Sequence, residues 1–183
     1  MKKNIQRMSV TAVLLALATV LSLLKPFNLP YGGSITLLSM LPIVMIPLMY
    51  GTRWGLVGAF FYALIQLALD LGSVLSWGLT PWALIGTIAL DYLLAFGCLG
   101  FAGVFKRKGI WGIAIGVVMV LVIRFLMHFI SGVVIFASIV DKDAWIYSLN
   151  YNASYMVPEF VTTTIAAVIL FKVPYIKRLI DKA

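Results

Sequence analysis

Long apolar runs separated by short polar connectors occupy almost the whole chain. Six runs can be distinguished, and they cover about residues 8–24, 35–50, 54–72, 81–105, 109–137 and 147–171. A transmembrane helix needs about 20 predominantly apolar residues, so six spans use about 120 residues and leave only short connectors. The pattern predicts an all-α integral membrane protein, a bundle of six transmembrane helices in a single membrane domain that takes up residues 1–183.

The composition excludes a soluble domain, and the charge distribution orients the predicted bundle. Hydrophobic residues make up 63% of the chain and charged residues 11%, and the mean hydropathy is +1.08, so most of the surface must face lipid. The net charge is +8, but the Lys and Arg residues lie mainly at the ends of apolar runs, where they mark the cytoplasmic side rather than a nucleic-acid site. Placing both termini in the cytoplasm leaves only Lys25 and Lys142 in outer loops and predicts a multi-pass protein of the cell membrane.

The sequence offers neither a set of metal ligands nor a nucleotide-binding motif. It contains one cysteine, Cys98, inside an apolar run, and one histidine, so no intrachain disulfide can form and no spacing of metal ligands is present. No G-x-x-x-x-G-K-[ST] sequence is present, so any ATP-driven step requires partner subunits. We therefore expect no cofactor and no metal, and we interpret Cys98 as a small packing residue.

Small residues recur at intervals that let helices approach closely in lipid. They are Ala12 and Ala16, Gly51 and Gly55, Gly112 and Gly116, and, along the fourth run, Gly97, Gly100 and Gly103. Tight packing within the bundle is the usual role of such residues. A sharper alternative is that one of these faces docks another protein. Ala12 and Ala16 are the best candidates for docking, because a first helix readily lies at the edge of a bundle.

Ionisable residues lie within the fourth and fifth runs, where lipid makes them costly. Asp91 is too deep in its run to reach the headgroups, so it pairs with Arg124 or His128, contacts a ligand, or does both. One face of the fifth run carries residues that recur every four positions, namely Arg124, His128, Gly132 and Phe136. A cation, an imidazole, a gap and an aromatic ring thus share a face. We interpret Arg124 as internal charge balance.

The sixth run begins with a cluster of aromatic and amide side chains. It contains Trp145, Tyr147, Asn150, Tyr151, Asn152 and Tyr155, followed by Glu159. Tyrosine and tryptophan at a span end commonly form an interfacial aromatic belt, but amides just inside the membrane need hydrogen-bond partners. Asn152, Tyr155 and Glu159 fall on one helical face. We interpret Glu159, like Arg124, as charge balance and packing.

Together these residues favour a small, flat, cationic heterocycle as the ligand. A carboxylate supplies negative charge, aromatic rings supply cation–π contact, and amides fix the hydrogen-bond register; an uncharged vitamin-like ring is also accommodated. Three other classes stay open at this point. They are an intramembrane enzyme that uses Asp91, His128 and Glu159 as acid and base groups, a stand-alone secondary transporter or channel, and a membrane scaffold. The first lacks a nucleophile motif, and the second lacks a clear internal repeat.

Three segments resemble the thiamine-specific S component (ThiT family) of energy-coupling-factor (ECF) transporters. They are YGGSITLLSMLPI, LDYLLAFGCLGFAG, and RFLMHFISGVVIF followed by WIYSLNYNASYMVPE. The third is the most specific, and the resemblance extends over essentially the whole chain. It implies a membrane subunit, not an enzyme, that binds thiamine from outside in a pocket lidded by the first outer loop. It also implies partners, an ECF module made of a transmembrane coupling protein and two ATPase subunits.

The resemblance further implies ligand and docking residues. The family's ligand-binding positions fall on Asp91, Tyr92, His128, Tyr147 and Asn152, with Phe136 as a stacking wall, and its Ala-x-x-x-Ala docking motif falls on Ala12 and Ala16. Some members carry tryptophan at the positions of Gly33 and Phe136, and glutamate at that of Asp91. Trp77 or Trp82 would then supply the missing stacking ring. A thiamine precursor such as a hydroxymethylpyrimidine is the nearest alternative ligand.

Overall fold

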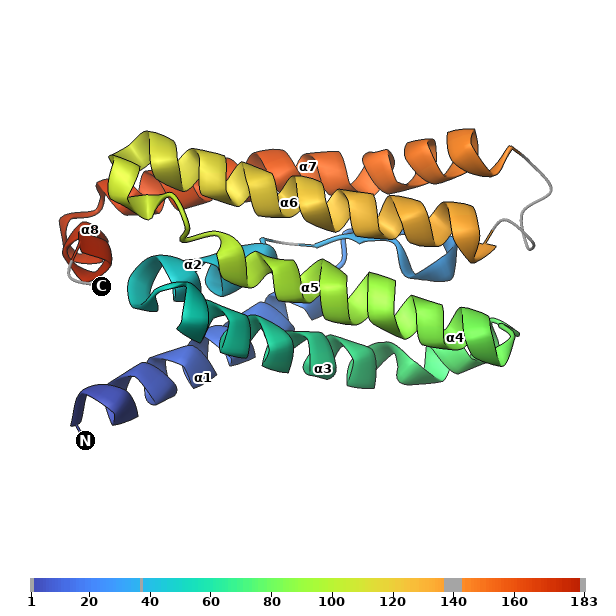
Figure 1. Cartoon of the computed structure of the whole chain (residues 1–183), viewed down its shortest axis with the longest axis horizontal. Coiled ribbons are helices and arrows are strands. Elements are labelled where there is room, and N and C mark those ends of the chain that lie inside the picture. The colour runs from blue at the N-terminus through green and yellow to red at the C-terminus, as the bar shows by residue number, and fades with distance from the viewer. Residues whose placement is uncertain (1, 37, 137–142, 182–183) are drawn as a thin grey trace.

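Helices form almost all of the structure and are arranged as an elongated bundle (Figure 1). The computed structural model describes residues 2–36, 38–136 and 143–181. Its helices are α1 (Lys2–Leu23), η1 (Pro30–Gly32), α2 (Met40–Tyr50), α3 (Thr52–Ser76), α4 (Pro81–Thr87), η2 (Ile88–Leu94), α5 (Ala95–Gly97), η3 (Cys98–Phe101), η4 (Lys106–Lys108), α6 (Gly109–Val134), α7 (Ala144–Lys172) and α8 (Pro174–Asp181). Two short strands, β1 (Phe27–Asn28) and β2 (Ser34–Ile35), pair antiparallel on either side of η1.

Five of the six predicted runs form helices that are long enough to span a membrane, and the remaining one forms a shorter helix than the sequence predicts. Within the described residues, five helical stretches are long and apolar enough to cross a membrane, and α2 is a shorter apolar helix. The predicted run 35–50 is helical only over Met40–Tyr50, because its first residue belongs to β2. A helix of this length extends about 16 Å, about half of the hydrocarbon core. It is almost entirely buried, so neighbouring helices, rather than lipid, surround it.

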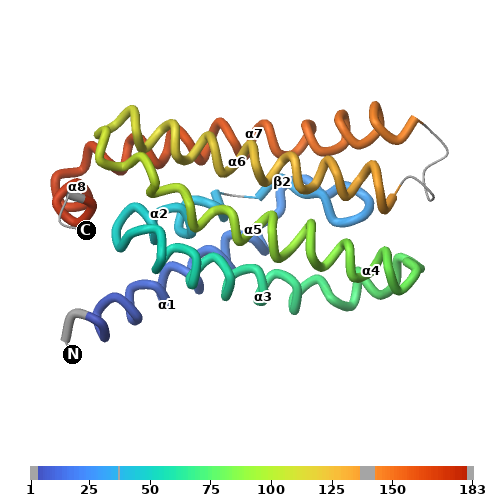
Figure 2. The backbone as a smooth tube through the Cα atoms, viewed as in Figure 1, coloured from blue at the N-terminus to red at the C-terminus, as the bar shows by residue number. Residues whose placement is uncertain are grey.

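The helices form two groups with α2 between them. α6 and α7 pack along each other on one side of the bundle, and α1 and α3 lie on the opposite side (Figures 1 and 2). The start of α1, the basic turn η4 and α8 lie at one end, whereas the junction of α3 with α4 and the start of α7 lie at the other (Figure 1). Both chain ends are therefore at the same end of the bundle.

The fourth predicted span is helical but changes its winding along its length. α4 begins after Thr80, whose Oγ1 accepts a hydrogen bond from Ala83 N–H at 3.3 Å. The chain then enters the π-helical segment η2, where Ala95 N–H donates to Leu90 O. π-Helical segments are rare in proteins, and those that occur are often found at functional sites. This one contains Asp91. Helical structure ends with η3, and turns replace the last predicted residues of the span.

Glycines allow close approach of backbones in the fourth span. A Cβ atom at Gly100 would lie 2.6 Å from backbone atoms of Leu56 in α3, whereas one at Gly97 would have no neighbour within 4 Å. The spacing of small residues in this span therefore serves helix packing at some positions and not at others. Ala12 and Ala16, by contrast, are exposed on the outer face of α1.

Replacing Gly100 by alanine is expected to destabilise the protein, because the added methyl group would overlap backbone atoms that cannot rotate away. Overpacking of this kind costs about 1–3 kcal/mol, so the purified protein should unfold at a lower temperature. The matched control is Gly97→Ala, which adds the same atoms in the same span where there is open space. Equal melting temperatures for the two variants would contradict the packing shown by the structure.

Candidate functional site

A cavity lies among α3, η2, α6 and α7 beneath the segment that contains β2. Its volume is about 980 Å³ when the solvent-open space at its entrance is included. The cavity is lined by all of the predicted ligand residues, which are Asp91, Tyr92, His128, Phe136, Tyr147 and Asn152. The whole stripe predicted on the fifth run also lines it, since Arg124 and Gly132 face the same space. The structure thus brings together residues that are up to 61 positions apart, from Asp91 to Asn152.

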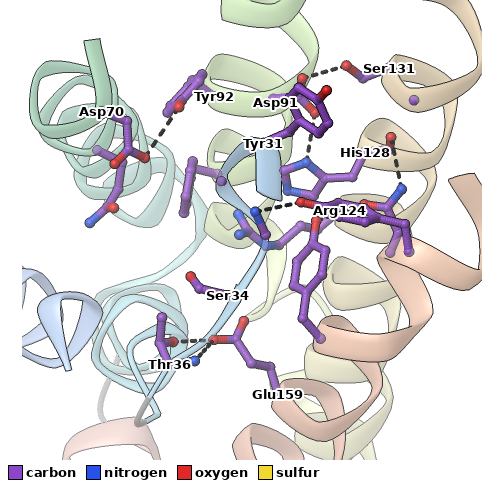
Figure 3. A pocket seen from close by; sticks show the side chains of 18 of the residues that line it. Tyr31, Ser34, Thr36, Asp70, Asp91, Tyr92, Arg124, His128, Ser131 and Glu159 are labelled. Atoms are coloured by element: carbon purple, nitrogen blue, oxygen red, sulfur yellow. Dashed lines mark hydrogen bonds and ion pairs between the residues drawn. The ribbon is translucent and has the colours of Figure 1, made fainter. Parts of the chain in front are cut away.

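Asp91 is the centre of a hydrogen-bonded cluster (Figure 3). Its Oδ1 lies 2.8 Å from His128 Nδ1, and its Oδ2 accepts a hydrogen bond from Ser131 Oγ at 2.5 Å. His128 and Ser131 are three residues apart on α6 and share a face. Of the two pairings that the sequence left open for Asp91, the structure shows the one with His128. No ion pair joins Asp91 to Arg124 among the described residues.

His128 has a ring nitrogen available for a ligand. Its Nε2 atom is buried and has no hydrogen-bond partner within the described part of the chain. Because Nδ1 faces a carboxylate, a neutral ring carries its proton on Nδ1, and Nε2 is then an acceptor. Buried polar atoms are rarely left without a partner. The cavity is therefore suited to a ligand that donates a hydrogen bond at this point.

Asn152 is buried, and its amide fastens α7 to α6. Nδ2 donates to Ser148 O at 2.9 Å and is 3.4 Å from His128 O, while Oδ1 accepts from Tyr155 OH at 2.7 Å. One lone pair of Oδ1 remains for a ligand. Asn150, the other amide noted in the sequence, is exposed and does not line the cavity. The two asparagines thus have different roles, and only Asn152 belongs to the site.

Three aromatic rings form one wall of the cavity. Tyr31, Trp77 and Phe136 contact one another, with ring centroids 6.4, 5.9 and 5.7 Å apart. Tyr31 lies in η1, Trp77 is the residue that follows α3, and Phe136 lies two residues beyond the end of α6. Trp82 is 82% exposed and lies outside the cavity lining. Of the two tryptophans considered as a replacement stacking ring, only Trp77 is in position for it.

Asp70 is a cavity residue that the sequence reasoning missed. Tyr92 OH donates a hydrogen bond to its Oδ2 at 3.3 Å, and Lys25 Nζ lies 4.0 Å from its Oδ1. The sequence carried the same signal for Asp70 as for Asp91, because both are carboxylates inside an apolar run. Because Lys25 offsets the charge of Asp70, Asp91 is the carboxylate that more directly favours a positively charged ligand.

Arg124 and Glu159, both interpreted from the sequence as charge balance, also line the cavity. The guanidinium carbon of Arg124 lies 4.0 Å from the centre of the Phe96 ring, a cation–π arrangement. Glu159 Oε1 accepts hydrogen bonds from the backbone N–H of Thr36, at 2.9 Å, and from the Thr36 hydroxyl (Figure 3). Arg124 thus stacks on a ring, and Glu159 holds the segment that covers the cavity.

The sequence as a whole matches a known protein family. A family model described as "Thiamine transporter protein (Thia_YuaJ)" matches residues 8–178. The chain belongs to this thiamine transporter family. A curated relative, "Thiamine transporter ThiT" of Bacillus subtilis (strain 168), is 33% identical over 185 residues, which cover 92% of this chain and 92% of the relative. The resemblance inferred from sequence segments is thereby confirmed.

The fold also agrees with that of a solved structure of a protein named ThiT. A structure of ThiT from Listeria monocytogenes superposes with a TM-score of 0.75 at 21% sequence identity, and the match covers 97% of this chain and 98% of that one. At this identity the likeness concerns the fold alone. The family and the curated relative are transporters, so the prediction that the chain is not an enzyme is confirmed. The alternative of an intramembrane enzyme is excluded.

Proposed function

We propose that this chain is the substrate-binding membrane subunit, or S component, of an ECF-type importer and that it captures thiamine from the outside. The observation that carries the proposal is the cavity, which is lined by all six residues that the family resemblance implies for ligand binding. Membership in the thiamine transporter family supports thiamine as the cargo. The exposure of Ala12 and Ala16 on α1 supports a docking role for this pair.

Thiamine combines an aminopyrimidine with a cationic thiazolium ring, and the cavity offers groups suited to both. Asp91 supplies negative charge for the cation. The wall of Tyr31, Trp77 and Phe136 supplies aromatic faces for stacking and cation–π contact. In this arrangement His128 Nε2 accepts a hydrogen bond from the exocyclic amine, because among the described residues that line the cavity it is the buried acceptor atom without a partner.

Transport requires partners, since the chain has no nucleotide-binding motif. In the proposed assembly, two ATPase subunits hydrolyse ATP and a transmembrane coupling protein docks on Ala12 and Ala16. Both termini lie on the cytoplasmic side, and the chain works as one membrane domain of six spans in which α2 is the shortened one. Thiamine is released because docking favours a state of the subunit that binds it less well. That difference in affinity must come from the partners.

Titrating the purified protein with thiamine is expected to give saturable, high-affinity binding that can be followed by tryptophan fluorescence. The emission should change because Trp77 lines the cavity. The absence of saturable thiamine binding would refute the proposed function. A hydroxymethylpyrimidine is included as a competitor, and tighter binding of this compound than of thiamine would identify a precursor as the cargo.

Two tryptophan variants serve as the matched controls for this titration. Trp77→Phe is expected to remove most of the thiamine-dependent change in emission, whereas Trp82→Phe should retain it, because Trp82 is exposed outside the cavity. Calorimetry on both variants checks that binding itself persists. An equal fluorescence response in the two variants would place Trp77 away from the ligand.

A further inference from the structure

The cavity is covered by a short segment that we name the strap, residues 29–36. Tyr31, Gly33 and Thr36 of the strap line the cavity. The strap is held to the residues just before it by the β1–β2 pairing, and within itself by the hydrogen bond from Leu29 N–H to Gly33 O, at 2.7 Å. Such a small hairpin is marginally stable on its own. Its position over the cavity therefore depends on contacts with the surrounding helices.

Tyr151 of α7 attaches to the middle of the strap. Its hydroxyl oxygen accepts a hydrogen bond from Gly33 N–H at 2.8 Å, and its hydroxyl group donates to Pro30 O. The absence of a side chain at Gly33 makes room for this contact, because a Cβ atom there would lie 2.5 Å from the Tyr151 hydroxyl oxygen. One phenol thus bonds to two backbone groups of the strap.

Glu159 of the same helix attaches to the end of the strap. Its Oε1 accepts hydrogen bonds from both the backbone N–H and the hydroxyl of Thr36 (Figure 3). The side chain is 5% exposed, so water competes little for these bonds. A carboxylate that receives two hydrogen bonds from one residue fixes that residue firmly.

The two attachment points match each other in spacing. Tyr151 and Glu159 are eight residues apart on α7, which separates them by about 12 Å along the helix axis. The stretch from Gly33 to Thr36 spans about 10 Å when extended. The strap therefore lies along α7, which holds it at its middle and at its C-terminal end.

A third contact holds Tyr31, at the tip of the strap, against Trp77 and Phe136. Tyr31 has φ 60° and ψ 28°, a left-handed conformation that is uncommon for residues other than glycine. Its ring contacts Trp77 and Phe136. The tip thus meets rings that can contact a ligand, while the attachments that keep it in place come from α7.

We infer that Tyr151 and Glu159 are positioning residues that hold the strap closed and thereby set how slowly the ligand leaves. This inference rests on the proposed function for the identity of the ligand, thiamine. Neither side chain needs to touch thiamine for this role. Because α7 also carries Tyr147 and Asn152, a movement of this one helix would release the strap and change the pocket together.

The inference predicts faster dissociation of thiamine when an attachment is removed. Tyr151→Phe deletes only the hydroxyl group and keeps the ring that stacks on Tyr147, with centroids 5.8 Å apart. Stopped-flow fluorescence should show a dissociation rate constant raised about three- to tenfold, with the association rate constant nearly unchanged. The matched control is Ser154→Ala, which deletes a hydroxyl from the same helix whose hydrogen bond stays within α7. This control should dissociate at the wild-type rate.

Two substitutions at Glu159 separate a hydrogen-bonding role from a role of its charge. Glu159→Leu removes the acceptor and should raise the dissociation rate constant about three- to tenfold. Glu159→Gln removes the charge but keeps an oxygen for Thr36, so it should stay close to the wild-type rate. Equal acceleration in the two variants would overturn the role of Glu159 in the strap. An unchanged rate in Tyr151→Phe would do the same for Tyr151.

A measurement without thiamine distinguishes failure of this inference from failure of the proposed function. Amide hydrogen exchange of strap residues should be faster in Tyr151→Phe than in Ser154→Ala, whatever the ligand is. Thr36→Val, which removes one of the two donors to Glu159 from the strap side, should act in the same direction and replaces Glu159→Leu if that variant does not fold. Unchanged amide exchange of the strap in both Tyr151→Phe and Thr36→Val would overturn the inference. Absence of thiamine binding to the wild type would refute only the proposed cargo.

Discussion

Replacing Asp91 by asparagine is expected to weaken thiamine binding by more than about tenfold while leaving the yield of folded protein unchanged. The carboxylate faces both His128 Nδ1 and Ser131 Oγ, and an amide has one acceptor oxygen instead of two. Its NH2 group would face one of these donors. Hydrogen bonds to charged groups contribute about 1.5–3 kcal/mol, and the thiazolium cation would lose a nearby negative charge.

The measurement is the dissociation constant from calorimetry, with two control variants. Asp143→Asn removes a carboxylate outside the cavity, where Asp143 caps α7 by accepting hydrogen bonds from Trp145 N–H and Ile146 N–H. Asparagine caps helices about as well, so affinity should not change. Asp91→Glu keeps the charge and should retain most of the affinity. Wild-type affinity in Asp91→Asn would exclude Asp91 from the ligand site.

Much of the site could be predicted because helical periodicity is regular. Residues that recur every four positions lie on one face of any α-helix, and α6 places Arg124, His128 and Gly132 on the cavity, with Phe136 following just beyond its end. Depth in the apolar run identified Asp91 as a residue that needs a partner, and His128 is that partner. The helical period and the cost of burying a charge were sufficient to predict these residues, because both can be read from the sequence of a single helix.

The remaining parts of the site depend on contacts between distant segments, which periodicity does not reveal. Asp91 lies in a π-helical segment, and nothing in the apolar pattern distinguishes this segment from an α-helix. The hairpin formed by β1 and β2 falls partly inside a run that reads as a continuous span. The fit of Tyr151 against Gly33 joins residues 118 positions apart.

The role of Glu159 shows how a correct physical principle can still lead to an incomplete assignment. A carboxylate within a membrane needs compensation, and the sequence suggested charge balance as its source. In the structure, compensation includes two hydrogen bonds from Thr36. Those donors are available because the strap enters the bundle in extended form, with backbone N–H groups that no helix uses. The same bonds that satisfy the carboxylate also fix the cover of the cavity.

The outer face of α1 differs from the faces that hold the bundle together. Ala12 and Ala16 are exposed, whereas Thr11 and Ala18 on the other side of the helix are buried. Small side chains leave a shallow surface on which another helix can approach closely. This face lies away from the cavity, since no residue of α1 other than Ser22 lines it. Binding of thiamine and docking of a coupling protein therefore use separate surfaces in the proposed mechanism.

Replacing both Ala12 and Ala16 by tryptophan is expected to abolish thiamine uptake by cells that also contain the ECF module, while thiamine binding to the purified subunit stays unchanged. Two indole rings would keep the partner helix from approaching α1, whereas the cavity is untouched. The matched control is Val122→Trp with Leu126→Trp, a pair with the same spacing on α6 that is 43% and 45% exposed. Uptake of radiolabelled thiamine should continue in this control. Loss of binding in the α1 variant would show that the pair packs inside the bundle, and normal uptake would exclude this face as the docking surface.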